Sequence, residues 1–184
     1  SLVDAAPSGW WYTAAMPGRR MFVAHFSDAD LLPNNLARDA ERWSAFLAAA
    51  STATCARLES LGITPNGPAQ GIAAAGTILP GRVSGPDWVA VGDAAAALDP
   101  LASHGLAVAF WSGERAATAA VAVIRGDTAP LDAYGAATAS GMSRFIDGYA
   151  AHYGAERRFL NEPFWSRRMD SLQRNSPDQH RAEL

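Results

Sequence analysis

The residues with the clearest chemical potential lie in one short stretch near the middle of the chain. The carboxylate of Asp93 directly follows Gly92 and the apolar run Trp88–Val91, which is typical of a buried strand. Gly92 permits a sharp turn and a close approach of another group to the backbone. In open α/β sheets ligands bind just past the strand ends, so Asp93 is placed to accept hydrogen bonds from ligand hydroxyls.

A loop and a predicted helix start follow Asp93. Asp99-Pro100 marks the loop, and a helix is predicted to begin near His104-Gly105. The first N–H groups of a helix have no intrahelical acceptor, and the helix dipole makes that end positive. The stretch therefore suits a ligand that carries both hydroxyls and negative charge.

This order of residues resembles the second FAD-binding motif of the flavoprotein monooxygenase and halogenase superfamily. The similarity rests on Val91–Ala95 and Asp99–Leu106, and the spacing fits the tryptophan-halogenase-like branch, including relatives that hydroxylate tryptophan during quinone-cofactor maturation. The resemblance implies that Asp93 binds the ribityl chain and that the loop and helix face the isoalloxazine ring. The implied cofactor-binding residues are Gly92, Asp93, Asp99, Pro100, Leu101, Ser103, His104, Gly105 and Leu106. A strand, turn and helix with a capping aspartate and no ligand is the alternative.

The resemblance also implies an activity. An FAD-dependent monooxygenase or halogenase-like enzyme would act on a small aromatic substrate or on a tryptophan of a partner protein, with NAD(P)H or a reductase supplying electrons. His104 is the one catalytic candidate, because an imidazolium beside the flavin would stabilise the anionic reduced ring, although it could equally cap the helix or face solvent. Two other classes stay open: a non-oxygenase flavoprotein reductase of the same fold and an inactive scaffold.

Composition excludes several classes of protein. The 184 residues are 49% hydrophobic and 18% charged, which indicates a globular chain, and the net charge of −3 gives no reason to expect nucleic acid. The single cysteine, Cys55, excludes an internal disulfide and fits the cytoplasm. We expect no targeting signal and no metal site, because the sequence shows neither pattern. Glu114 and Arg115 interrupt the most apolar predicted helix, and this interruption argues against a membrane span.

The chain is expected to be the C-terminal part of an α/β flavoprotein with a Rossmann-like FAD domain. No Gly-x-Gly-x-x-Gly follows a strand, so the turn that binds the pyrophosphate would lie in an absent N-terminal half. We assign residues 1–80 to part of a substrate-binding domain, 81–126 to the end of the FAD-binding domain and 127–184 to a C-terminal helical region. Alone, such a chain should bind FAD weakly and expose an apolar patch near Val89, Val91 and Gly113.

The first segment is predicted to begin with a β-hairpin formed by residues 9–16 and 21–26. Side chains alternate along a strand, so Trp10 and Tyr12 share one side and Trp11 takes the other. The resemblance implies that Trp10 and Tyr12 wall the substrate cavity; the alternative is that they form the core face of the sheet. His25 is interpreted as a hydrogen-bonded structural residue.

The remaining elements are mostly helical. Residues 35–61 are predicted as a helix, with a break near 51–54 as the alternative, and residues 69–79 as a strand of small residues. The helix from Gly105 carries one apolar stripe that includes Leu106, Phe110, Gly113, Ala117 and Ile124. A second helical region spans 131–159, and the arginine-rich tail up to Arg168 would either form a solvated face or meet an acidic partner.

Overall fold

A computed structural model describes residues 1–64 and 81–174, and the predicted strand at 69–79 lies outside these residues. The chain divides into two compact units: one comprises Ser1–Ala74 and Tyr153–Leu184, the other Ala75–His152. This division differs from the three predicted segments, because the chain returns to the first unit at Tyr153. The functional assignment of those segments stays a prediction.

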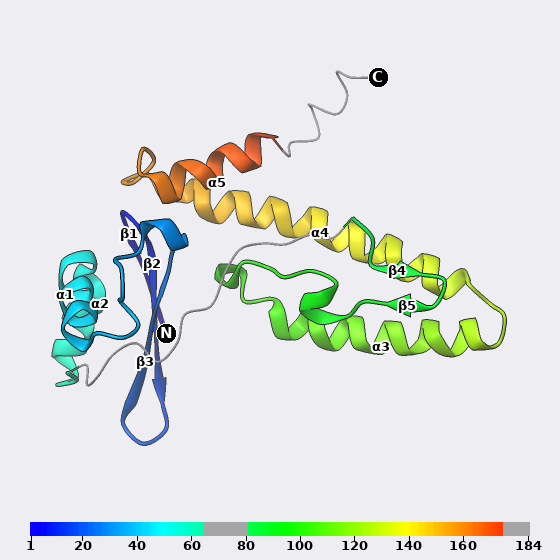
Figure 1. The fold of residues 1–184 in the computed structure, drawn as a ribbon, viewed down its shortest axis with the longest axis horizontal. Helices are drawn as coiled ribbons and strands as arrows, with labels where there is room; N and C mark the ends of the chain where they lie inside the picture. Colours follow the sequence, from blue (N-terminus) through cyan, green and yellow to red (C-terminus); the bar gives the residue numbers. More distant parts are fainter. Residues whose placement is uncertain (65–80, 175–184) are drawn as a thin grey trace. The chain divides into compact units, whose positions relative to one another are not determined.

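The first unit is built on a three-stranded antiparallel sheet in the order β1-β2-β3 (Figure 1). Its strands are β1 (Leu2–Ala6), β2 (Gly9–Met16) and β3 (Arg20–Phe26). The β2–β3 pairing confirms the predicted hairpin, with Trp11 opposite His25 and Tyr12 opposite Ala24. Gly9 has a φ of +151°, and a Cβ there would collide with the carbonyl oxygen of Phe26, so the β1–β2 turn requires glycine.

Two helices bury the Trp11 side of this sheet. They are α1 (Ala40–Ala50) and α2 (Thr52–Ser60), separated by Ser51 in an extended conformation, which confirms the break in the predicted helix. Asp39 fixes the start of α1 by accepting hydrogen bonds from the N–H groups of Glu41 and Arg42. Fully buried Trp11 packs with Leu47 and Leu58 in the core of the unit.

The Trp10 side of the sheet is partly covered by the C-terminal residues. Trp10 stacks on Phe26 with ring centroids 4.1 Å apart and donates its indole N–H to the hydroxyl of Tyr153 at 3.1 Å. Helix α5 (Pro163–Arg174) adds Trp165, whose indole N–H donates to the carbonyl of Ala6 at 2.8 Å. These long-range bonds attach the C-terminal helix to the sheet. Short 3-10 helix η1 (Ala29–Leu31) follows β3.

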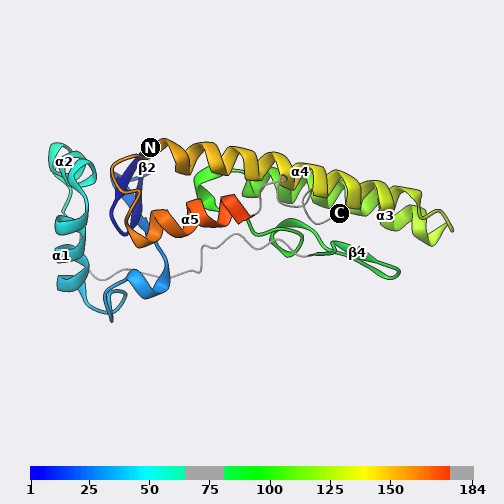
Figure 2. The same cartoon turned by 90° about the horizontal axis from the view of Figure 1, so that it is seen from above.

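The second unit consists mainly of α3 (Gly105–Ile124) and α4 (Ala129–Ala155), which run side by side (Figure 2). The predicted second helical region is one unbroken helix despite its four glycines, and its last turn, from Tyr153, belongs to the first unit. Tyr134 on α4 donates its hydroxyl to the carbonyl of Ala90 at 2.6 Å. This bond attaches the segment before α3 to α4.

The segment before α3 differs from its prediction. The expected buried strand at Trp88–Val91 is reduced to β5 (Trp88–Val89), which pairs antiparallel with β4 (Ser84–Gly85). Trp88 is 48% exposed and Val91 is also exposed. A strand inside a parallel sheet needs parallel neighbours, and the described residues supply only the antiparallel partner β4 for this segment.

The buried side of α3 also differs from the predicted one. Ser112, Ala116 and Ala119 are buried, whereas the apolar stripe faces outward: Leu106 and Phe110 are each 78% exposed and Ile124 is 85% exposed. Small residues allow α3 to approach its neighbours closely, so the large side chains lie on the free side. Of the apolar patch expected near Val89, Val91 and Gly113, Val91 is exposed, whereas Val89 and Gly113 are half-buried.

Candidate functional site

The turn at Gly92 is held rigidly against α3. Gly92 adopts a φ of +55°, is buried, and donates its N–H to the hydroxyl of Ser112 at 2.9 Å. A Cβ at this position would lie 3.6 Å from the Cβ of Ala109. The positive φ therefore favours glycine, and the short helix η2 (Gly92–Ala94) is fixed on the side of α3.

Asp93 follows this anchored turn and projects outward. Its side chain is exposed, and it forms no hydrogen bond or ion pair with any residue in the described part of the chain. A carboxylate held on a rigid backbone with no protein partner is available to accept hydrogen bonds from a ligand. The geometry is thus compatible with the predicted binding of ligand hydroxyls by Asp93, which stays a prediction.

The loop before α3 is organised by Asp99. Its buried carboxylate accepts a hydrogen bond from the N–H of Leu101 at 2.9 Å, which starts the short helix η3 (Pro100–Ala102) with Pro100 in its first turn. Ser103 then adopts a left-handed conformation with a φ of 54°, which redirects the chain into α3. The signals that predicted a loop here correspond to these local hydrogen bonds and dihedral angles.

The N-terminus of α3 has no side-chain cap. His104 occupies the N-cap position without a capping hydrogen bond, and its side chain is exposed, as are those at the start of the helix. A Cβ built on Gly105 would meet no atom within 4 Å. The first amides and the positive end of the dipole are therefore accessible to an anionic group.

The structure places the two predicted substrate residues on one side of β2. Trp10 is buried under Phe26 and Tyr153, whereas Tyr12 is half-buried and meets the half-exposed ring of Phe22 edge-on, with centroids 6.2 Å apart. Tyr12 and Phe22 thus border an open apolar part of the sheet. That Trp10 and Tyr12 contact substrate stays a prediction.

His25 has the structural environment expected of it. Its Nε2 lies 3.3 Å from the hydroxyl of Ser8, and its ring contacts Trp11 and Phe46 at centroid distances of 4.4 and 4.9 Å. Burial in this aromatic cluster lowers the pKa of His25 from 6.5 to about 4. The imidazole is therefore neutral at physiological pH and serves packing.

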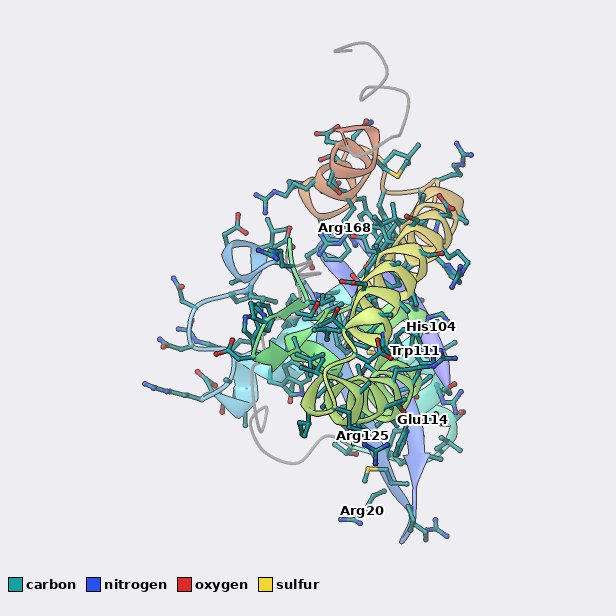
Figure 3. All side chains as sticks on the ribbon, turned by 90° about the vertical axis from the view of Figure 1, so that its right-hand side faces the viewer. Arg20, His104, Trp111, Glu114, Arg125 and Arg168 are labelled. Atoms are coloured by element: carbon teal, nitrogen blue, oxygen red, sulfur yellow. The ribbon has the colours of Figure 1, made fainter. Side chains whose placement is uncertain are left out.

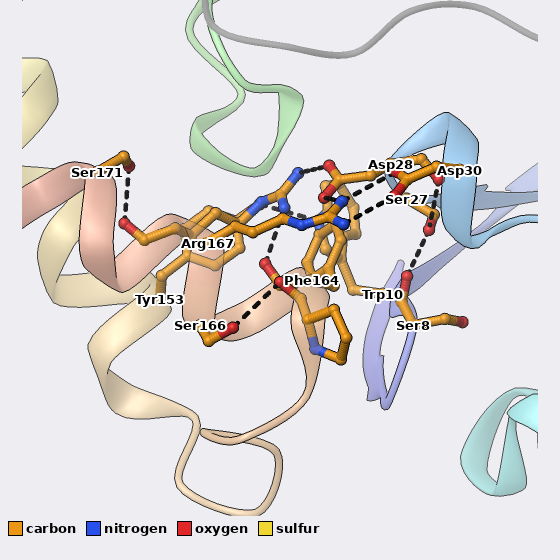
Figure 4. Close-up of polar contacts among 12 residues, drawn as sticks. Ser8, Trp10, Ser27, Asp28, Asp30, Tyr153, Phe164, Ser166, Arg167 and Ser171 are labelled. Atoms are coloured by element: carbon orange, nitrogen blue, oxygen red, sulfur yellow. Dashed lines mark hydrogen bonds and ion pairs between the residues drawn. The ribbon is translucent and has the colours of Figure 1, made fainter.

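Arg157 and Arg158 are exposed, as a solvated face would be, whereas Arg167 and Arg168 meet acidic side chains (Figure 4). Arg167 forms ion pairs with Asp28 and Asp30, and Arg168 pairs with Asp28 at 2.9 Å. The guanidinium of Arg168 also lies 3.4 Å from the ring centroid of Phe164. The hydrogen bond from Arg167 lowers the pKa of the Asp30 carboxyl. The acidic partner is a loop of the same unit, which sequence spacing alone does not reveal.

Sequence reasoning also missed a cavity between α3 and α4. It measures about 590 Å³, and no aspartate or glutamate is among the described residues that line it. Figure 3 labels two of its lining residues, His104 just before α3 and Trp111 on α3. The i, i+4 spacing of Trp111 and Arg115 is the signal that could have suggested a common face. Across residues 1–64 and 81–174, no cluster of three potential metal ligands occurs.

The fold and this candidate site define a class: a mixed α/β domain with a Gly-Asp turn packed on the helix that follows an Asp-Pro loop. The tryptophan halogenase family model matches residues 4–184, so the chain belongs to that family.

The chain is similar to two named proteins. The chain is 27% identical over 176 residues to LodB of Marinomonas mediterranea, whose name describes an FAD-dependent oxidoreductase; the match covers 90% of this chain and 43% of LodB. It is similar, with a TM-score of 0.71 and 26% identity, to the solved structure of QhpG, a peptidyl tryptophan dihydroxylase essential for tryptophylquinone cofactor biogenesis. That match covers 90% of this chain and 38% of QhpG. The chain thus spans less than half the length of either relative.

Proposed function

We propose that this chain supplies the ribityl and ring part of an FAD site in a halogenase-like oxidoreductase. The observation that carries the proposal is the exposed carboxylate of Asp93, which has no partner among the described residues and lies on a turn anchored to α3. Asp93 would accept hydrogen bonds from the ribityl hydroxyls, and the uncapped start of α3 would oppose negative charge on the reduced ring. Gly105 leaves the open backbone that a planar ring system requires.

The reaction that we propose is oxygenation of an aromatic substrate, with a tryptophan of a partner protein as the favoured target. Bound FAD, reduced by NAD(P)H or by a reductase, would supply the oxygen chemistry. Support comes from the similarity to QhpG and from the open side of the sheet beside Tyr12 and Phe22. Within the chain, His104 would stabilise the reduced ring if protonated, and Tyr12 would contact the substrate.

The test is a turnover assay of the whole protein with FAD, a reductant, oxygen and a tryptophan-containing peptide. Mass spectrometry should detect a peptide gain of one or two oxygen atoms that depends on flavin and oxygen. Consumption of NAD(P)H without oxygen transfer or peroxide would instead indicate the reductase alternative. A protein that never retains flavin would contradict the proposal and favour the scaffold.

We also propose that the outward stripe of α3 contacts a further part of the same protein. The stripe consists of Leu106, Phe110, Val121 and Ile124, four large apolar side chains that are all exposed. Burying each one would contribute roughly 1.5–3 kcal/mol. The relatives contain more than twice as much chain as this match covers, which provides an occupant for the stripe. By length and composition α3 could also cross a membrane, but Glu114 and Arg115 at its middle favour a protein contact in a cytoplasmic enzyme.

A further inference from the structure

The cavity between α3 and α4 has the properties of a binding site that is separate from the FAD proposal. Its volume of about 590 Å³ falls in the range of small-molecule pockets. Its walls come from Ala95–Leu98, from one side of α3 and from the facing side of α4. One end reaches His104, and the remainder runs along α3 past Trp111 to Arg115.

The charged side chains that line this cavity are both positive. Arg115 and Arg144 both line it, and neither forms an ion pair with any residue in the described ranges. Arg144 donates a hydrogen bond to the hydroxyl of Ser140 at 2.9 Å, and the guanidinium of Arg115 lies 5.9 Å from the ring centroid of Trp111. Two guanidinium groups without carboxylates favour an anion and disfavour a cation.

The other lining groups favour a flat apolar body. The rings of Trp111 and Tyr134 are nearly parallel, with centroids 6.0 Å apart, and Phe145 closes the α4 side. The hydroxyls of Ser112 and Thr138 donate to backbone carbonyls of their own helices. The two arginines are therefore the groups that would bind the polar part of a ligand. The rest of the cavity surface offers contacts with aromatic rings and alanine side chains.

We propose that this cavity binds a small organic anion with an aromatic body, an aryl carboxylate being the simplest example. The carboxylate would pair with Arg115 and Arg144, and the ring would lie against Trp111. The cavity adjoins the proposed FAD site, because His104 lines one end of it, but neither Asp93 nor any residue of 99–103 is among its lining residues.

The experiment is calorimetric titration of the whole protein with 2-naphthylacetate and, separately, with its neutral isostere 2-naphthylacetamide. At low salt we expect the carboxylate to bind at least about tenfold more tightly than the amide, because the two ligands differ only in charge and donor pattern. The combined Arg115→Gln and Arg144→Gln variant should reduce carboxylate affinity to that of the amide. The Arg115→Lys and Arg144→Lys variant should keep much of the preference.

The matched control is Arg125→Gln, which removes an exposed arginine at the end of α3 that does not line the cavity. It should leave both affinities unchanged, and flavin retention should be the same in every variant. Equal affinity for the two ligands in the unmodified protein would overturn the proposal even if a glutamine variant failed to fold. A charge preference that survives the double glutamine substitution, or that Arg125→Gln abolishes, would overturn it as well.

Discussion

The backbone N–H of Gly92 donates to the hydroxyl of Ser112 at 2.9 Å, across twenty positions of sequence. This buried bond links the turn that presents Asp93 to α3, the helix whose N-terminus we propose binds the same ligand. Ser112 also donates to the carbonyl of Ala109, so its hydroxyl accepts one hydrogen bond from the turn and donates another to its own helix. The separation between the carboxylate and the helix end is thereby fixed by a single side chain.

Replacing Ser112 with alanine should weaken both folding and flavin binding. The Gly92 N–H would lose its acceptor while staying buried, at a cost of about 1–3 kcal/mol. Thermal denaturation should report a lower melting temperature, and flavin retention should fall with it. The control is Thr118→Ala, which removes a similar hydroxyl-to-carbonyl bond on the exposed side of α3 and should change stability little. Equal effects of the two substitutions would contradict the anchoring role.

Asp93→Ala should weaken FAD retention in the whole protein by about tenfold or more, because a charge-assisted hydrogen bond contributes roughly 1.5–3 kcal/mol. Folding should be unaffected, since Asp93 has no protein partner in the described residues. Gel filtration followed by flavin absorbance measures the occupancy. Asp87→Ala, which removes another exposed carboxylate nearby, should leave the occupancy unchanged. Full occupancy in Asp93→Ala would remove this residue from the site.

Phe110→Asp should strongly destabilise the whole protein if the α3 stripe is covered there. The phenyl ring is 78% exposed within this chain, so the substitution would be nearly neutral if the stripe faced solvent. A buried unpaired carboxylate costs several kcal/mol. Chemical denaturation of the whole protein distinguishes the two cases, with Thr118→Asp, an exposed position on α3, as the control. A stability equal to that of the control would rule out a contact at this face.

The ion pairs of the tail should stabilise the first unit unequally. Asp28→Asn removes the carboxylate that pairs with both Arg167 and the half-buried guanidinium of Arg168 and should cost about 1–3 kcal/mol. Asp30→Asn removes a pair whose side chains are 47% and 62% exposed, so its effect should be about 0–1 kcal/mol. Urea denaturation of each variant measures the difference. A larger loss in Asp30→Asn would show that Arg168 does not depend on Asp28.

Stability should fall in mild acid because of His25. The folded-state pKa is lowered to about 4, so between pH 6.5 and about 4 the unfolded chain binds a proton that the folded chain does not. The free energy of unfolding should therefore decrease as the pH drops through this window, while above about pH 6.5 the residue contributes no slope. His25→Phe should flatten the profile, and His152→Gln, at an exposed position, should leave it unchanged. A slope that persists in His25→Phe would assign it to other groups.

Local signals in the sequence determined most of the element boundaries. The hairpin at 9–26 and the helix from Gly105 were predicted, and the break at Ser51 was the alternative to one helix over 35–61, because turns, caps and helical periodicity act over a few residues. The order and spacing of Gly92, Asp93 and Asp99 resemble an FAD-binding motif, and the role of these residues in binding FAD stays a prediction.

The tertiary structure decided which side of each element is buried and which charges meet. Periodicity identified the apolar stripe of α3, yet the buried side is that of Ser112, Ala116 and Ala119, because close helix packing selects small residues. Arg167 meets Asp28 across 139 positions, and Trp10 meets Tyr153 across 143. Such contacts depend on how distant segments pack together, and a pattern confined to neighbouring residues contains no information about that packing.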